Sequence, residues 1–130
     1  MKKLVLITAL IALVGLAWGQ TTTGPWILIQ QQQNVKIYRS YGECNGQLTV
    51  FLKVVNENNN AVSVAFDSAF NLSGNLLPVE LKKNYMVPAS STHGGDCTTD
   101  DAKINPYNYV STIQMGVSDY IIRNLKIVQL

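Results

Sequence analysis

The stretch SSTHGGDCTTDD, residues 90–101, contains the residue types that nucleophilic catalysis and metal binding use. It holds His93, the only histidine of the chain, and Cys97, one of the two cysteines. A cysteine nucleophile needs a histidine base that a third group orients, and such groups are normally assembled from distant parts of a fold. The closeness of His93 and Cys97 in a glycine-rich segment therefore carries little weight. The pattern favours a polar loop with a structural cysteine, and we expect neither enzyme activity nor a cofactor.

The same stretch contains three acids, Asp96, Asp100 and Asp101. Zinc sites take three or four Cys and His ligands, and the chain offers only His93 and its two cysteines. Calcium binds carboxylates and loop carbonyls, but the spacing of these aspartates differs from the EF-hand pattern. We interpret them as a solvated acidic turn and expect no metal site.

Aromatic residues follow this stretch in the sequence NPYNY. Tyr107 and Tyr109 flank Asn108, a combination that suits stacking on a sugar or anchoring a protein contact. Tyrosine is also common in strands, where it binds nothing. We keep Tyr107, Asn108 and Tyr109 as candidate ligand-binding residues. Asn71 begins the tripeptide NLS, which fits the glycosylation pattern but proves little by itself.

The N-terminus predicts an export signal. Lys2 and Lys3 precede an apolar run from Leu4 to Leu16, and small residues, Ala17 and Gly19, stand three and one positions before Gln20. This is the pattern of a secretory signal peptide over residues 1–19, of a kind typical of bacteria. The run is shorter than a spanning helix requires, so we expect no membrane anchor after cleavage. Residues 20–130 then form one exported domain, secreted or periplasmic.

Charge argues against a nucleic-acid partner. The chain has 10 Lys and Arg and 8 Asp and Glu, and two of the lysines lie in the signal peptide. The exported domain is therefore electrically balanced, and no basic stripe remains for nucleic acid or an anionic membrane.

The two cysteines, Cys44 and Cys97, remain in the exported domain. An even number of cysteines in an oxidising compartment predicts a disulfide. Two free thiols are the alternative. Closing so long a loop stabilises the fold by roughly 4 kcal/mol in the chain-entropy model.

Alternation of apolar and polar residues predicts strands throughout the domain. The strongest is residues 47–56, whose partly apolar second face calls for a covering layer or a partner. Strands are also expected at 26–30, 34–41, 61–70, 76–81, 107–115 and 120–130, with the turn GECNG before residue 47 and Cys44 in it. We expect 47–56 and 61–70 to form a hairpin, and residues 82–106 to be mostly loop with a short strand at 85–87. Pro78 should lie at an edge or bulge, and Arg123-Asn124 should mark a bulge.

About seven short strands without a helix predict an all-β fold, a small antiparallel sandwich of the immunoglobulin-like kind. A small Greek-key barrel is the alternative. An exported, non-catalytic domain that contacts a protein or a cell-surface glycan is the expected function. The alternative is a domain that binds a small ligand, carbohydrate or calcium, through the loop 82–110.

Overall fold

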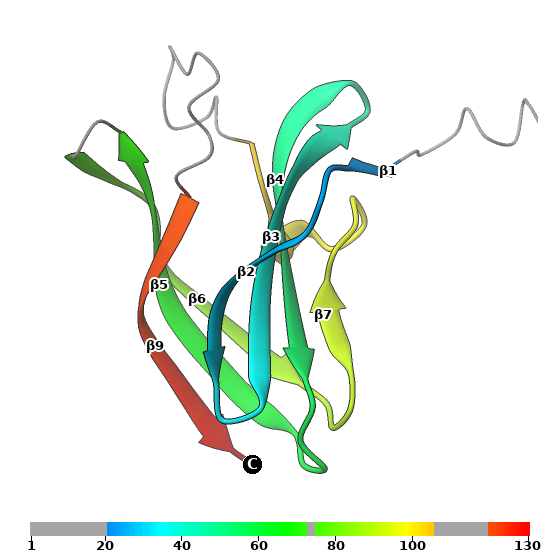
Figure 1. Ribbon diagram of the computed structural model, residues 1–130, viewed down its shortest axis with the longest axis vertical. Helices are drawn as coiled ribbons and strands as arrows, with labels where there is room; N and C mark the ends of the chain where they lie inside the picture. The colour runs from blue at the N-terminus through cyan, green and yellow to red at the C-terminus, as the bar shows by residue number, and fades with distance from the viewer. Residues whose placement is uncertain (1–20, 73–74, 106–119) are drawn as a thin grey trace, which may run out of the picture.

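The computed structural model is almost entirely β-strand (Figure 1). It describes the backbone at residues 21–72, 75–105 and 120–130, and side chains at 23–70, 82–105 and 120–130. The strands in this part of the chain are β1 (Thr21–Thr23), β2 (Ile27–Gln32), β3 (Val35–Cys44), β4 (Gln47–Asn56), β5 (Val62–Leu72), β6 (Asn75–Val87), β7 (Thr92–Gly94), β8 (Lys103–Ile104) and β9 (Tyr120–Gln129). One turn of 3-10 helix, η1 (Asp100–Ala102), precedes β8.

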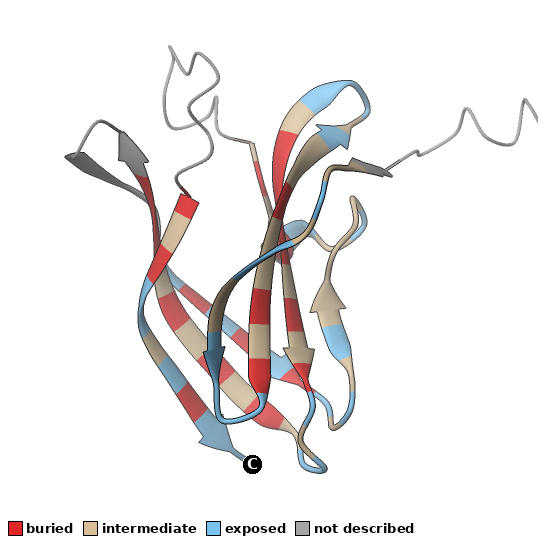
Figure 2. Ribbon diagram, in the orientation of Figure 1, coloured by how far each residue is buried: buried red, intermediate tan, exposed pale blue. Residues whose placement is uncertain are grey.

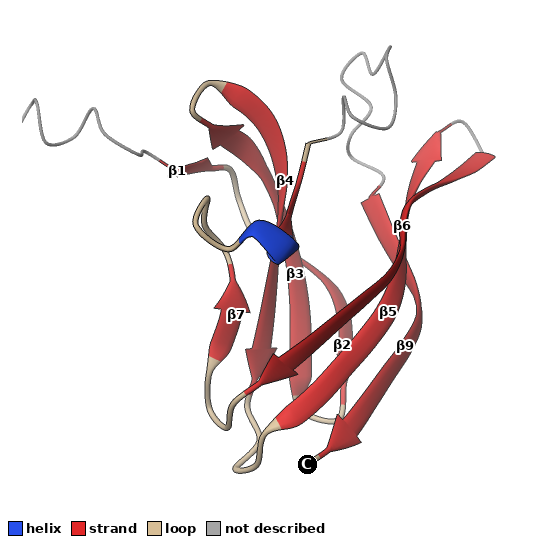
Figure 3. Ribbon diagram, turned by 180° about the vertical axis from the view of Figure 1, so that it is seen from behind, coloured by secondary structure: helices blue, strands red, loops and turns tan. Residues whose placement is uncertain are grey.

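The strands form two antiparallel sheets. In the larger sheet β1 and β2 pair with one side of β3, β4 pairs with the other side, and β7 and β8 pair with the far side of β4. The smaller sheet has the order β6-β5-β9. The two sheets lie face to face and diverge toward one end, as Figures 1 and 3 show from opposite sides.

The predicted small antiparallel sandwich is confirmed, and the sheets do not close into a barrel. Four main strands, β2-β3-β4-β7, face three, β6-β5-β9, the same division as in a seven-stranded immunoglobulin sandwich. The order along the chain is its own, because β2, β3 and β4 are consecutive neighbours in one sheet.

One hydrophobic core fills the space between the sheets, because alternate residues of each strand point inward (Figure 2). Aromatic side chains meet edge to face within it, with ring centroids 5.8 Å apart for Phe66 and Tyr85 and 5.7 Å for Phe70 and Tyr120. The other fully buried apolar members are Val35, Ile37, Val50, Leu52, Val54, Val62, Val64 and Val87.

The predicted hairpin between residues 47–56 and 61–70 is wrong. β4 pairs with β3, β7 and β8, whereas β5 pairs with β6 and β9 in the opposite sheet. The connection at residues 57–61 therefore carries the chain from one sheet to the other. Alternation alone does not separate the two arrangements, because paired strands and facing strands both direct apolar residues into the same core.

The interpretation of GECNG as a loop that contains Cys44 is also wrong. β3 continues to Cys44, which pairs with Gln47 across the two residues Asn45 and Gly46. Both have positive φ, 53° and 79°, as a tight two-residue hairpin turn requires. Cys44 is therefore the last residue of a strand.

The expected loop over residues 82–106 is wrong in part, whereas the short strand expected within it at 85–87 is confirmed as the end of β6. β6 extends to Val87, β7 occupies Thr92–Gly94, and β8 follows η1. Two smaller predictions are confirmed: Pro78 lies on the edge strand β6 beside a register shift, and β9 bulges around Asn124, whose φ is 57°. The strand predicted at 107–115 lies outside the described residues.

Candidate functional site

His93 lies in β7, opposite Val54 of β4. Its Nε2 is 2.8 Å from Oδ1 of Asp101, and its ring lies against the ring of Tyr85 with centroids 4.7 Å apart. The Tyr85 hydroxyl donates a hydrogen bond to the main-chain oxygen of Asp101. These three residues, which come from β6, β7 and η1, link the edge strand β6 of the smaller sheet to the edge strand β7 of the larger sheet.

A histidine oriented by a carboxylate supplies two of the three members of a nucleophilic site, and the third would be a thiol or hydroxyl within reach of the histidine. Cys97 does not supply it, because its sulfur is bonded to Cys44, with the two Cα atoms 5.8 Å apart. The predicted disulfide is thus present. The His93–Asp101 contact acts as a structural link between β7 and η1.

The disulfide holds residues 95–99 over the outer face of the larger sheet. On that face Cys44, Phe51 and Lys53 follow one another along the β3–β4 ladder. Cys97 is bonded to Cys44, and Gly95 lies against the side chain of Lys53. The segment from Gly95 to Cys97 therefore crosses Phe51. Phe51 is fully buried although it points away from the core between the sheets. This segment is the covering layer that the apolar second face of residues 47–56 predicted.

Gly94 positions the start of this segment. It has φ of 87°, and a Cβ there would lie 2.3 Å from the main-chain oxygen of Leu52 and 2.8 Å from Cβ of Ala102. Only glycine fits this approach, because the space above β4 is already occupied by backbone.

The three aspartates of the opening stretch each have a partner in the protein. Oδ1 of Asp96 accepts hydrogen bonds from the amides and hydroxyls of Thr98 and Thr99, at 2.7 to 3.2 Å. These bonds, with the Thr98 hydroxyl first, hold the pKa of Asp96 below its usual range.

The other two aspartates, both in η1, pair with the side chains of a lysine and of the histidine. Oδ1 of Asp100 is 3.0 Å from Nζ of Lys103, and Asp101 contacts His93. Within the described residues no group of three or more His, Cys, Asp or Glu is placed to hold a metal ion.

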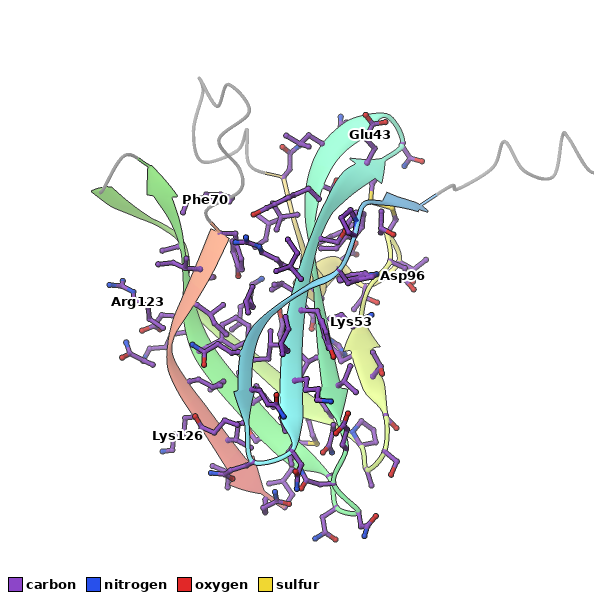
Figure 4. The ribbon with its side chains drawn as sticks, in the orientation of Figure 1. Glu43, Lys53, Phe70, Asp96, Arg123 and Lys126 are labelled. Carbon is purple, nitrogen blue, oxygen red and sulfur yellow. A yellow bond between two sulfur atoms is a disulfide. The ribbon has the colours of Figure 1, made fainter. Side chains whose placement is uncertain are left out.

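An aromatic pair lies on the outer face of the larger sheet. Nζ of Lys53 is 4.2 Å from the ring centroid of Trp26 and 5.0 Å from that of Tyr38. Figure 4 shows Lys53 on β4 behind the crossing of β2 and β3. Because the ammonium group of the protein itself lies against both rings, these faces are engaged within the fold.

The candidate ligand-binding residues Tyr107, Asn108 and Tyr109 lie outside the described residues, and so does the side chain of Asn71. Their roles stay predictions.

The outer face of the smaller sheet carries a shallow trough that the sequence did not reveal. The central strand β5 contributes small outward residues, Ser63 and Ala65. Longer side chains of β6 and β9 flank them, and an open hollow of about 310 Å³ lies over Ala65 and Asp67. Small residues at alternate positions of SVAF were the only local signal. The two rims lie about 40 positions apart in the sequence, because Asn84 of β6 and Lys126 of β9 pair with opposite sides of Ala65.

Comparison with known proteins gave no family: no family model, no curated protein and no solved structure matches the chain. Over the part of the chain that the structure describes, no helix is long and apolar enough to cross a membrane.

Proposed function

We propose that the chain is an exported, non-catalytic β-sandwich domain whose function is to bind another protein, at or outside the cell surface. The signal-peptide pattern and the disulfide support the exported context. The bond is one that a reducing cytosol does not maintain.

The observation that carries the binding role is the position of the exposed apolar side chains. In the described ranges, all of the large apolar side chains that are exposed lie on edge strands or directly after one. They are Ile27, Leu28, Met86, Val128 and Leu130. Their exposed fractions run from 43% to 73%, which is high for residues that favour burial. Exposed apolar groups along a sheet edge support contact with a partner.

Side-chain contact is the favoured mode, rather than addition of a strand to the sheet. β2 has a register shift between Leu28 and Gln30, and β9 has one around Asn124. Bulges of this kind interrupt the row of free amides and carbonyls that an added strand needs.

Site-specific photo-crosslinking in cells that export the protein tests the proposal. A photoreactive amino acid replaces Leu28 or Val128, and a control carries it at Asn59, an exposed turn residue. We expect a covalent adduct with one defined protein from the edge positions and none from Asn59. Adducts of equal yield from all three positions, or from none, contradict the proposed function.

A further inference from the structure

The trough on the outer face of the smaller sheet is amphiphilic along its length. At one end, just beyond the residues that line the hollow itself, Ser63 lies between Met86 and Val128, which are 73% and 43% exposed. One pleat further on, Ala65 lies between Asn84 and Lys126. The apolar end thus leads directly into a polar and basic end.

Three exposed cations lie at the basic end: Lys82 of β6 and Lys126 of β9 line the hollow, and Arg123 of β9 lies beside it, opposite Asp67. The buried Lys83 also lines this end. Figure 4 shows Arg123 and Lys126 projecting from β9 into solvent, away from the core. Among the residues whose side chains are described, the acid that lines this end is Asp67, and its Oδ2 already accepts a hydrogen bond of 2.8 Å from Asn124.

These three cations differ from the other basic residues that the structure describes. Within the described residues Lys82, Arg123 and Lys126 make no ion pair and no hydrogen bond through their side chains. Every other described basic side chain has a partner in the protein, namely Lys36, Arg39, Lys53, Lys83 and Lys103. The unpartnered positive charge of an otherwise balanced domain is therefore gathered on one face, where it attracts an anionic partner.

We propose that this trough binds an acidic, extended peptide segment of the partner protein, with Lys82, Arg123 and Lys126 contacting its carboxylates. Met86 and Val128 hold an apolar side chain of the same segment, a role for which the flexible thioether of methionine is well suited. This inference rests on the protein-binding function proposed above. From Ser63 to Asp67 the floor is about 13 Å long, at roughly 3.3 Å per residue, which accommodates a few extended residues.

Two other occupants fit the observations less well. An acidic polysaccharide would use aromatic faces for stacking, and no exposed aromatic side chain lines this hollow in the described part of the chain. A second copy of the chain would offer few free carboxylates. Asp96, Asp100 and Asp101 are engaged with Thr98, Lys103 and His93, and Glu57 pairs with Lys36, which leaves Glu43 as the free acid among the described residues of the larger sheet.

Fluorescence anisotropy with a labelled peptide that alternates glutamate and leucine tests the proposal on the mature chain. A peptide with glutamine in place of glutamate is the control ligand. We expect Lys82→Gln and Lys126→Gln each to weaken binding of the acidic peptide roughly two- to fivefold, as the loss of one exposed ion pair does. Lys36→Gln removes one partly exposed charge, paired with Glu57, from the larger sheet and should leave the affinity unchanged. Equal losses in all three variants would overturn the proposal.

A second variant separates the trough from general charge attraction. Ala65→Leu keeps every charge but fills the floor between Asn84 and Lys126, so we expect at least a tenfold loss of affinity with an unchanged melting temperature. Undiminished binding by Ala65→Leu, tighter binding of heparin than of the peptide, or concentration-dependent dimers that block the peptide would each overturn the proposal.

The crosslinking experiment distinguishes the failure of this inference from the failure of the proposed function. If a photoreactive residue at Asn84 gives no adduct while Leu28 still captures its defined protein, the trough is not the site but the domain still binds a protein. If neither position gives an adduct, both the inference and the proposed function fail.

Discussion

At the scale of single residues, one buried amide organises the passage of the chain between the sheets. Asn56, at the end of β4, is 1% exposed. Its Nδ2 donates to the main-chain oxygens of Asn60, Val87 and Pro88, at 2.9, 3.2 and 3.0 Å. Its Oδ1 accepts from both nitrogens of Asn58. The side chain thus joins the 57–61 connection to the end of β6, and the three carbonyls depend on it as a donor.

Replacing Asn56 by aspartate should be among the most destabilising changes in the domain. The shape is preserved, but a buried carboxylate would face three carbonyl oxygens in place of an amide donor. We expect the free energy of unfolding to fall by about 3 kcal/mol or more, measured by urea denaturation. Asn59→Asp, an isosteric change at an exposed position of the same turn, should cost less than about 0.5 kcal/mol. Similar losses in the two variants would show that the Asn56 network is not needed.

The carboxylate of Asp96 makes the stability of the folded state depend on pH. Hydrogen bonds from Thr98 lower its pKa in the folded state, whereas in the unfolded state it takes the usual value of about 3.9. The unfolded state therefore binds more protons as the pH falls, so the stabilisation is complete above about pH 4 and is lost as the pH falls through the lowered pKa. Solvent exposure keeps the effect below about 1 kcal/mol.

Asp96→Asn isolates this contribution, since the amide oxygen still accepts hydrogen bonds but does not ionise. We expect the wild type to be the more stable protein at neutral pH and its advantage to shrink below about pH 4. Melting temperatures of both proteins between neutral and acidic pH measure it. A difference that is independent of pH would contradict the assignment.

At the scale of elements, the disulfide fixes a cover over the outer face of the β3–β4 hairpin. We expect Cys44→Ala and Cys97→Ala each to cost about 2–4 kcal/mol, and the double variant to cost about the same as either single one, because each loses the same bond. Unfolding in urea measures these costs. Titration of the denatured, unreduced protein should find no free thiol.

Phe51 provides a local readout of the same cover. Once the bond is broken, residues 95–99 lose their covalent tie to β3 and keep only weaker contacts such as the hydrogen bond from Lys103 to the main-chain oxygen of Cys97, so Phe51 should become accessible. Binding of a dye that reports exposed apolar surface should then rise in the Cys97→Ala variant, and not in Phe51→Ala that also lacks Cys97. Two reactive thiols in the native protein would refute the bond and return His93 and Cys97 to consideration as a catalytic pair.

Several elements of the fold could be predicted from the sequence alone. Strand β4 has the predicted bounds, and its faces are as expected, because alternation over ten residues is a strong local signal. The two bulges were predictable from Pro78 and from Asn124, since each residue disturbs a ladder by itself. The turn at Asn45-Gly46 was also readable, because this dipeptide strongly favours a tight hairpin.

The partners of the strands could not be derived in the same way. β7 is only three residues long, and it exists as a strand because Thr92, His93 and Gly94 pair with β4. Such pairing depends on contacts between residues about 40 positions apart, which no local pattern records.

At the scale of the whole molecule, the charged side chains that the structure describes are distributed unevenly between the two sheets. Asp96 lies on the side of the larger sheet, and Arg123 and Lys126 project from the smaller sheet on the opposite side of the molecule (Figure 4). The even balance of the composition conceals this separation. The candidate trough was invisible in the sequence for the same reason, because Lys82 and Lys126 become neighbours only when β6 and β9 flank β5.

Export is the prediction that belongs to the whole chain. The mature protein should begin at Gln20, because Ala17 and Gly19 provide the small side chains that signal peptidase requires three and one positions before the cut. Mass spectrometry and N-terminal sequencing of the exported material should find that end. Replacing Ala17 and Gly19 with arginine should block processing, whereas Trp18→Ala, at the unconstrained position between them, should not. The unprocessed chain should retain Met1 and stay with the membrane fraction. Soluble protein that retains Met1 in the wild type would refute the signal peptide and remove the oxidising compartment on which the disulfide depends.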